Sequence, residues 1–292
     1  MEEREHIMKS FMSRRQFIYA AGAIAGSAVL AGCGSSSDSS SSDSTSSDSS
    51  SSSQEATDDS YTLVTEGTIT CIAEMGFTPF EYMDDQTGEP KGFDIDLMAA
   101  IADHMGLTST WLPSQAFDTL VPTIKQGGKA DVACSGITIN DERKQEIDFS
   151  DPYMDSNQSI VVQAGSTETE ETLNDASKTI ACQAGTTGDE WISENLPNAQ
   201  KVSLQDVAAA MAGVETGLYN AFVIDLPVSS NLISQSFTDL EIAEEIPTGE
   251  QYGIAISKDN PNLTKAINQA LQDMNDDGTM AELQQTWFGT EL

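Results

Sequence analysis

The sequence predicts an α/β protein made of two lobes that are joined by two chain crossings. β-type runs alternate with helical runs from residue 61 onward, the same order starts again after Pro152-Tyr153, and the last strand and helices return to the first unit. Strands that alternate with helices indicate a parallel sheet with right-handed crossovers. We therefore expect a ligand site in the cleft between the two lobes.

The elements of the first lobe follow one another at short intervals. A β-type run at 68–73 leads into a Gly/Pro-marked loop at 76–80 and a hairpin-like stretch near Asp84-Asp85. Asp94 is expected to cap a helix that Gly106 closes, because apolar residues recur between them at helical spacing. The further expected elements are a strand containing Trp111, a helix over 117–125 and a strand over 131–134.

The second lobe is expected to repeat this alternation. Its elements are a strand at 159–163, a strand at 178–183, a helix opened by the turn 185–188, a helix over 207–215 and a strand over 221–224 that ends in Asp225. A strand at 252–257 and helices near 263–274 and 280–287 then return the chain to the first lobe. We expect lobe 1 at 61–152 and 253–292, lobe 2 at 158–247, and a two-segment hinge at 153–157 and 248–252.

Residues 1–32 have the pattern of an export signal and are set aside from fold reasoning. Arg14-Arg15 precedes an apolar run at 17–30 that is about half as long as a bilayer span requires, and the run ends in Leu-Ala-Gly-Cys33. This ending resembles the lipobox of bacterial lipoproteins, which implies a diacylglyceryl group on Cys33. Residues 13–17 also resemble a twin-arginine signal, although the general export route accepts two arginines as well.

Residues 33–60 are dominated by Ser and Asp, which predicts a disordered tether between a lipid anchor and the folded part. The formal net charge of the chain is −34. A surface this acidic disfavours nucleic acid and anionic lipid headgroups, so attachment to a membrane is assigned to the lipid on Cys33. We expect no nucleic-acid partner, and a location on the outer side of the cell membrane.

The cysteines beyond residue 33 are Cys71, Cys134 and Cys182, an odd number without the spacing of a metal site. All three lie in apolar strand-like runs, so we expect buried free thiols. A Cys71–Cys134 disulfide is the alternative if their strands are neighbours. We expect no metal site and no cofactor.

Five motifs follow one another in a recognisable order. They are FTPFE at 77–81 with GFDID at 92–96, SGITINDER at 135–143 with IDFSDPY at 147–153, ACQAGTTG at 181–188, YGIA at 252–255, and WFG at 287–289. Together they resemble the bacterial extracellular solute-binding proteins of family 3, which serve polar amino acid ABC importers. The resemblance covers residues 61–292 and implies the periplasmic-binding-protein type II fold, with an amino acid held between the lobes and a membrane permease as partner.

The resemblance also implies the roles of individual residues. Arg143 aligns with the arginine that holds the ligand α-carboxylate, which suits the planar guanidinium. Asp225 aligns with the acid that pairs with the α-ammonium. The further residues implied around the carboxylate are Thr138, the backbone of Gly136 with Ser135 nearby, and Thr186 and Thr187 at a helix N-terminus.

The side chain of the ligand is expected to lie between Phe77 and Phe117, with Glu74 at its end. A carboxylate at Glu74 accepts hydrogen bonds from an amide or ammonium and repels an acidic side chain. Gln183 and Ile224 depart from the lysine and histidine of some glutamine binders, which puts glutamine specificity in doubt. Arginine, lysine, ornithine, glutamine and cystine remain open, with cationic ligands ahead.

Two other functions remain as alternatives. The first is a cyclohexadienyl-dehydratase-like enzyme with Glu74 or Asp225 as general acid. Only His6 and His104 are present, and no Ser-His-Asp set or phosphate-binding loop is visible, so an enzyme is not expected. The second is a sensor domain for a signalling partner, against which stands the absence of a signalling segment after Leu292. A monomer is expected.

Overall fold

The computed structural model describes residues 60–290 of the chain. The expected export signal, the expected lipidation site Cys33 and nearly all of the expected tether lie outside these residues. Within 60–290, no helix combines the length and the apolar character that a membrane crossing requires.

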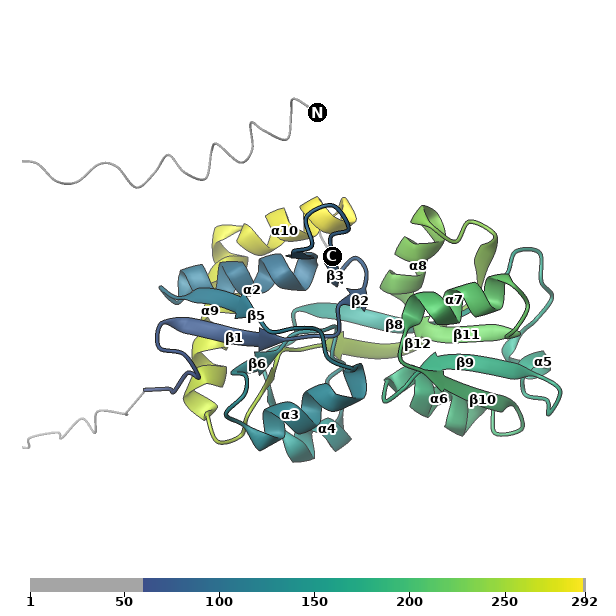
Figure 1. Ribbon diagram of the computed structural model, residues 1–292, viewed down its shortest axis with the longest axis horizontal. Helices are drawn as coiled ribbons and strands as arrows, with labels where there is room; N and C mark the ends of the chain where they lie inside the picture. Colours follow the sequence, from purple (N-terminus) through teal and green to yellow (C-terminus); the bar gives the residue numbers. More distant parts are fainter. Residues whose placement is uncertain (1–59, 291–292) are drawn as a thin grey trace, which may run out of the picture. The chain divides into compact units, whose positions relative to one another are not determined.

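The first lobe is built on a five-stranded sheet in the order β5-β1-β6-β13-β7. Its strands are β1 Thr68–Ile72, β5 Thr108–Trp111, β6 Val132–Ala133, β7 Asp148–Phe149 and β13 Ala255–Ile256. A small sheet joins β2 Gly76–Phe77, β3 Glu81–Met83 and β4 Pro90–Lys91. The helices are α2 Phe93–His104, α3 Leu120–Gln126 after the 3-10 turn η1 Phe117–Thr119, α4 Asp141–Glu146, α9 Pro261–Asp277 and α10 Thr279–Phe288. Helices α2 and α10 lie along one face of the large sheet, and α3 and α4 lie along the other (Figure 1).

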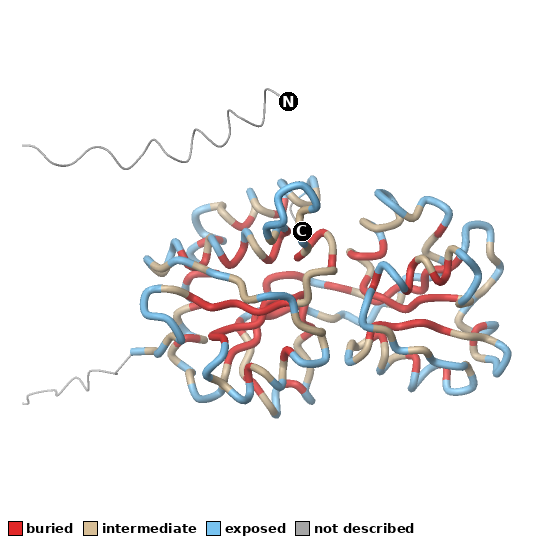
Figure 2. The backbone as a smooth tube through the Cα atoms, in the orientation of Figure 1, coloured by how far each residue is buried: buried red, intermediate tan, exposed pale blue. Residues whose placement is uncertain are grey.

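The second lobe is built on a five-stranded sheet in the order β10-β9-β11-β8-β12. Its strands are β8 Met154–Gln163, β9 Thr179–Gln183, β10 Gln200–Leu204, β11 Ala221–Asp225 and β12 Leu240–Tyr252. Its helices are α5 Glu170–Leu173, α6 Thr187–Asn195, α7 Val207–Glu215 and α8 Leu226–Gln235. The inner strands of both sheets are largely buried, whereas the edge strands β5 and β10 contain exposed and partly buried residues (Figure 2). The two-lobed α/β fold class is therefore confirmed.

Both sheets are mixed, so the expectation of a parallel sheet holds for only part of each sheet. In the first sheet β1 pairs in parallel with β5 and β6, but β13 runs antiparallel to β6 and β7. In the second sheet β9 is parallel to β10 and β11, but β8 is antiparallel to β11 and β12. The antiparallel strands include the segments that carry the chain from one lobe to the other.

The two crossing segments pair with each other. At their ends near the first lobe, β8 and β12 pair Met154 with Tyr252 and Ser156 with Glu250. Strand β12 was missed by sequence reasoning, which expected a strand only from residue 252. The boundaries of the hinge at 153–157 and 248–252 remain a prediction.

Asp94 does not cap helix α2, which corrects the sequence expectation. The cap position is Gly92, whose φ of 143° lies in a region that favours glycine. A Cβ on Gly92 would lie 1.9 Å from the carbonyl oxygen of Phe80, so only glycine fits between hairpin and helix. Asp94 therefore falls in the first turn, with its side chain buried in the lobe.

The three cysteines are buried and free, as expected. Cys71 and Cys134 belong to neighbouring strands or their ends, since β1 pairs with β6. They nevertheless form no disulfide. Burial raises the pKa of each of these thiols, to about 11 for Cys182.

Candidate ligand-binding site

Arg143 is a buried cation at the start of the short helix α4. The side chain of Asn140 accepts a hydrogen bond from the Arg143 backbone N–H at 2.8 Å and caps the helix. Only 8% of Arg143 is exposed. Its guanidinium donates from Nη1 to the carbonyl of Thr138 at 2.8 Å and from Nη2 to the carbonyl of Gly185 at 3.0 Å, so it contacts both lobes.

The ring of Phe117 lies beneath this guanidinium. The Arg143 Cζ atom is 5.5 Å from the ring centroid, within the range of a cation–π contact. Burial lowers the pKa of Arg143, while the charges of Glu190, Asp225 and Glu250 raise it. Phe117 thus contacts the guanidinium of Arg143, and its expected contact with a ligand side chain remains a prediction.

Asp225 is the last residue of β11, where strand ends face the cleft. Its Oδ2 atom accepts a hydrogen bond from the Tyr252 hydroxyl at 2.6 Å, and its Oδ1 atom accepts one from Gln158 Nε2. Burial and, after it, the neighbouring charge of Glu250 raise the pKa of Asp225 to about 7. A carboxyl with a raised pKa beside a cleft is suited to receive a cation from a ligand.

Glu250 is a second acid at this end of the cleft and was missed by sequence reasoning. Its Oε2 atom accepts from Thr187 Oγ1 at 3.0 Å, from Gln158 Nε2 at 3.0 Å and from Thr138 Oγ1 at 3.3 Å. Glu250 therefore connects the crossing strands to a threonine from each lobe. In the sequence, Glu250 lies two residues before the YGIA motif, which is the nearest of the motifs to it.

Glu74 and Gln183 meet across the cleft. Glu74 follows β1, and its Oε2 atom accepts from Gln183 Nε2 at 3.3 Å. Gln183 is buried at the end of β9 and also donates to the carbonyl of Gln205 at 3.1 Å. Burial raises the pKa of Glu74 to about 7, and the charge of Asp206 adds to the shift. The structure thus brings these two sequence-predicted residues together.

Ser135 and Gly136 form the turn that follows β6. Gly136 has a φ of 53°, and a Cβ there would lie 2.6 Å from Phe77 Cε1, so the bare backbone permits this ring to pack closely. The Gly136 N–H donates to Asp94 Oδ2 at 3.0 Å. This amide is thus engaged within its own lobe, unlike the free donor that the resemblance implied. Ser135 Oγ likewise donates to Glu81 Oε1 at 2.6 Å.

Thr186 and Thr187 begin helix α6. Thr186 is its N-cap, because Oγ1 accepts from the Asp189 N–H at 3.2 Å while donating to the carbonyl of Gln183 at 2.8 Å. Thr187 turns toward Glu250. Both threonines therefore lie at the expected helix N-terminus, and their hydroxyls bond to protein groups.

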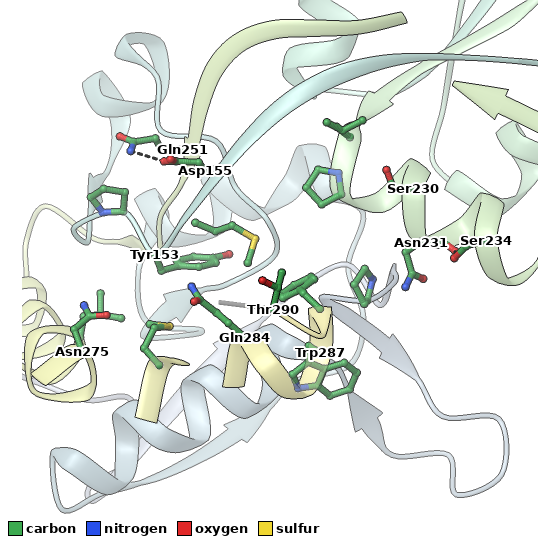
Figure 3. A pocket seen from close by; sticks show the side chains of 18 residues that line it. Tyr153, Asp155, Ser230, Asn231, Ser234, Gln251, Asn275, Gln284, Trp287 and Thr290 are labelled. Atoms are coloured by element: carbon green, nitrogen blue, oxygen red, sulfur yellow. Dashed lines mark hydrogen bonds between the residues drawn. The ribbon is translucent and has the colours of Figure 1, made fainter. Parts of the chain in front are cut away.

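A cavity lies elsewhere between the lobes. It has a volume of about 810 Å³ and is lined by α8 on one side and α10 on the other. Ser230, Asn231 and Ser234 face Gln284 and Trp287 across it, and the Gln251–Asp155 hydrogen bond lies at its edge (Figure 3). None of the residues that line this cavity belongs to the predicted site. The candidate site is therefore identified by the chemistry of the predicted residues.

Known proteins resemble this chain over its folded part. The sequence profile of the bacterial extracellular solute-binding proteins, family 3, matches residues 69–290. The L-cystine-binding protein TcyJ of Escherichia coli (strain K12) is 28% identical over 227 residues, which cover 77% of this chain and 84% of that protein.

Two solved structures show the same fold. An ancestral arginine-binding protein bound to arginine has a TM-score of 0.72 and 33% identity, covering 76% of this chain and 98% of that chain. The ancestral amino acid-binding protein AncCDT-1, a precursor of cyclohexadienyl dehydratase, has a TM-score of 0.71 and 33% identity, covering 76% of this chain and 96% of that chain.

Proposed function

Because the chain belongs to the bacterial extracellular solute-binding proteins of family 3, we propose that it captures a cationic or polar neutral L-amino acid and delivers it to the permease of an ABC importer. Its relatives in this family are amino acid-binding proteins of ABC transporters.

The observation that carries the proposal is the buried Arg143 at the junction of the lobes. Two of its N–H groups are held by the carbonyls of Thr138 and Gly185, which fixes the guanidinium plane. The remaining N–H groups of the fork are available to a carboxylate. A ligand carboxylate bound there supplies the negative partner that a buried guanidinium requires.

Negative charge lies near Arg143 at the junction of the lobes. Asp225 and Glu250 both contact Gln158 Nε2, and both act electrostatically on Arg143. An α-ammonium between these carboxylates would complete the pairing of a zwitterion. The excess of acid over base favours a ligand that brings additional positive charge.

Glu74 sets the preference for the side chain. With Gln183 it forms a polar end that is separate from Arg143, and a carboxylate there pairs with an ammonium or guanidinium or accepts from an amide. Arginine, lysine and ornithine fit this end best, followed by glutamine and cystine. Aspartate and glutamate are disfavoured because like charges would be brought together.

Closure of the cleft follows from contacts between the lobes. Arg143 reaches Gly185, Gln183 reaches Glu74, and Gln205 Nε2 donates to Asp118 Oδ2 at 3.3 Å. A ligand held by groups of both lobes binds the closed state more tightly than the open state and shifts the population toward closure. We propose that bending at 153–157 and 248–252 separates the lobes in the unliganded state.

For the location, we propose that Cys33 carries the lipid and that residues 33–60 tether the folded part to the outer face of the cell membrane. Release of the folded part from membranes by a Cys33→Ala substitution, followed in cell fractions, tests this anchoring. Retention in the membrane fraction would contradict it.

A thermal-shift screen tests the ligand class. The protein is heated with each of the twenty amino acids, cystine, ornithine and citrulline, and with Arg143→Ala as the matched control. A ligand at a thousandfold its Kd stabilises the native state by about 4 kcal/mol. A shift with arginine, lysine or ornithine that disappears in the variant is expected. A shift with aspartate or glutamate alone would refute the class, and no shift at all would direct attention to a sensor or a dehydratase.

A further inference from the structure

Glu81 and Asp94 form a carboxyl pair inside the first lobe, beneath the ligand-binding residues. Both side chains are 0% exposed. Among the ion pairs of residues 60–290, none includes either of them. Burial disfavours the charged form of a carboxyl, and two carboxylates side by side repel each other. The pair therefore needs a compensating group.

The hydrogen bonds around the pair leave a place for one proton. Glu81 Oε1 accepts from Ser135 Oγ at 2.6 Å, and Asp94 Oδ2 accepts from the Gly136 N–H and the Tyr153 hydroxyl, each at 3.0 Å. Glu81 Oε2 and Asp94 Oδ1 are buried without a donor. The two carboxyls accept from the adjacent residues Ser135 and Gly136, and a side-chain hydrogen bond between the carboxyls contributes to the pKa of each. Because a carboxylate only accepts, such a bond exists only if one carboxyl is protonated.

We propose that Glu81 and Asp94 share one proton, donated by Glu81 Oε2 to Asp94 Oδ1, and that this pair positions the turn 135–138 of the ligand site relative to strand β8. The proton gives each of the two unpartnered oxygens a partner. With this proton, each hydrogen bond of the network has one donor and one acceptor. Ser135 Oγ accepts from the Glu74 N–H at 3.1 Å and donates its own hydrogen in a hydrogen bond to Glu81.

The surroundings place the proton on Glu81. Burial raises the pKa of Glu81 well above its usual range, and the charge of Asp94 raises it further. Burial raises the pKa of Asp94 only to about 6, since the donors Gly136 and Tyr153 favour its charged form. The other titratable groups that face the pair are Glu74 after β1, Cys134 after β6 and Tyr153 before β8. Burial raises the pKa of Cys134 and of Tyr153, which keeps both neutral.

Four chain segments meet at this proton. Glu81 begins β3, Asp94 lies in α2, the turn 135–138 follows β6, and Tyr153 immediately precedes β8. The same turn carries Gly136 against Phe77, and the carbonyl of Thr138 holds Arg143. Loss of the proton would set two charges against each other under the turn that supports the carboxylate site. That the turn serves a ligand rests on the proposed function, whereas the shared proton does not.

The first test compares the wild type with Glu81→Gln in thermal unfolding of the unliganded protein between pH 5 and 8. In the unfolded chain Glu81 ionises near its ordinary pKa of 4.5, whereas the folded chain keeps the proton. Its contribution to stability is therefore full below that pH and is lost as the pH rises toward the folded-state pKa. Glutamine supplies the donor and acceptor without titrating, so the melting temperature of the variant should rise relative to the wild type by roughly 3 °C per pH unit.

The matched control for this test is Glu66→Gln, which makes the same substitution at an exposed position. The difference in melting temperature between this control and the wild type should stay constant with pH. A constant difference for Glu81→Gln as well would show that Glu81 carries no extra proton and would overturn the proposal. Glu74 and Asp225 titrate in the wild type and in both variants. Their effects therefore cancel when the melting temperature of each variant is compared with that of the wild type at the same pH.

The second test measures hydrogen exchange of the peptides that cover residues 132–138. Glu81→Met keeps the length of the side chain but removes its donor and acceptor, so these amides should exchange about tenfold faster. Glu81→Gln should restore exchange to within about twofold of the wild type. Unchanged exchange in Glu81→Met would refute the positioning role. Neither test needs a ligand, so the failure of the proposed function would leave both decisive.

Discussion

Two pairs of acidic residues in this molecule have the same arrangement, in which an aspartate accepts a hydrogen bond from a tyrosine and a glutamate lies nearby. Asp225 is paired with Glu250 and accepts a hydrogen bond from Tyr252, whereas Asp94 is paired with Glu81 and accepts one from Tyr153. The rings of the two tyrosines lie 6.2 Å apart between centroids. We call Asp225 with Glu250 the cleft pair, and Asp94 with Glu81 the core pair.

The difference between the pairs lies in what neutralises them. The cleft pair has Arg143 within electrostatic reach, and Glu250 is only half-buried, so a ligand cation has access. The core pair is fully buried and has its proton as the one compensating charge that we assign. In our proposals, the same arrangement of acid and tyrosine serves as a ligand-binding group in the cleft pair and as a positioning group in the core pair.

The largest effect that separates the pairs is expected from Arg143→Ala. It removes the cation that faces the cleft pair and should weaken ligand binding by about a hundredfold or more, since a hydrogen-bonded charge pair is lost. Titration calorimetry with the ligand found in the thermal-shift screen measures this loss. Exchange at 132–136 should change little, because Arg143 bonds to this turn at its far end, the carbonyl of Thr138. Near-wild-type affinity would show that the carboxylate site lies elsewhere.

A comparison of Asp225→Asn with Asp94→Asn is expected to show the next largest effect. Asp225→Asn removes the charge that meets the α-ammonium and should lower affinity by about thirtyfold with little change in the melting temperature. Asp94→Asn should instead lower the melting temperature of the unliganded protein. The two variants are measured by calorimetry and by thermal unfolding. If both variants lost affinity equally without losing stability, the distinction between the pairs would fail.

The third expectation concerns pH. Burial raises the pKa values of Glu74 and Asp225 to about 7, so both are partly protonated in the unliganded protein at that pH. A cationic ligand favours their charged forms, so binding releases protons and affinity should rise by about tenfold from pH 6 to pH 8. Calorimetry in buffers of different ionisation enthalpy measures this proton release. A neutral ligand should show less of it, and affinity that falls over this range would contradict the assignment.

The smallest effect is expected from Glu74→Gln. This variant keeps the hydrogen-bonding shape next to Gln183 but removes the charge, so cationic ligands should lose about threefold to tenfold in affinity. Neutral amino acids should change little. The ratio of the two affinities is the quantity to measure, and equal losses would remove Glu74 from the selection of the side chain.

Sequence reasoning predicted most of the fold because local patterns specified it. Helix α7 begins and ends where the apolar spacing placed it, and β11 ends at Asp225 as expected. Strand β12 was not predicted, because its sequence contains several glutamates, Pro247 and Gly249, which are uncommon in strands. Such a strand is possible at the edge of a sheet with an irregular register, and its pairing with β8 depends on residues far away in the chain.

The candidate site was predicted only in part for the same reason. The motifs located Arg143, Asp225 and Glu74, which the structure places at the cleft. Glu250 and Gln158 come from the two crossing strands, and their meeting follows from the register of those strands. The engagement of the Gly136 amide by Asp94 likewise required the position of α2.

The buried thiols have a practical consequence for observing the lobes. Thiolates are the reactive form of cysteine, and Cys71, Cys134 and Cys182 are buried with raised pKa values, so maleimides should leave them unmodified in the folded protein. Val64 in the first lobe and Leu218 in the second are exposed. Cysteines introduced at these two positions would accept a fluorophore pair without removal of any native residue from the core, and energy transfer between the dyes would report the opening of the cleft in real time.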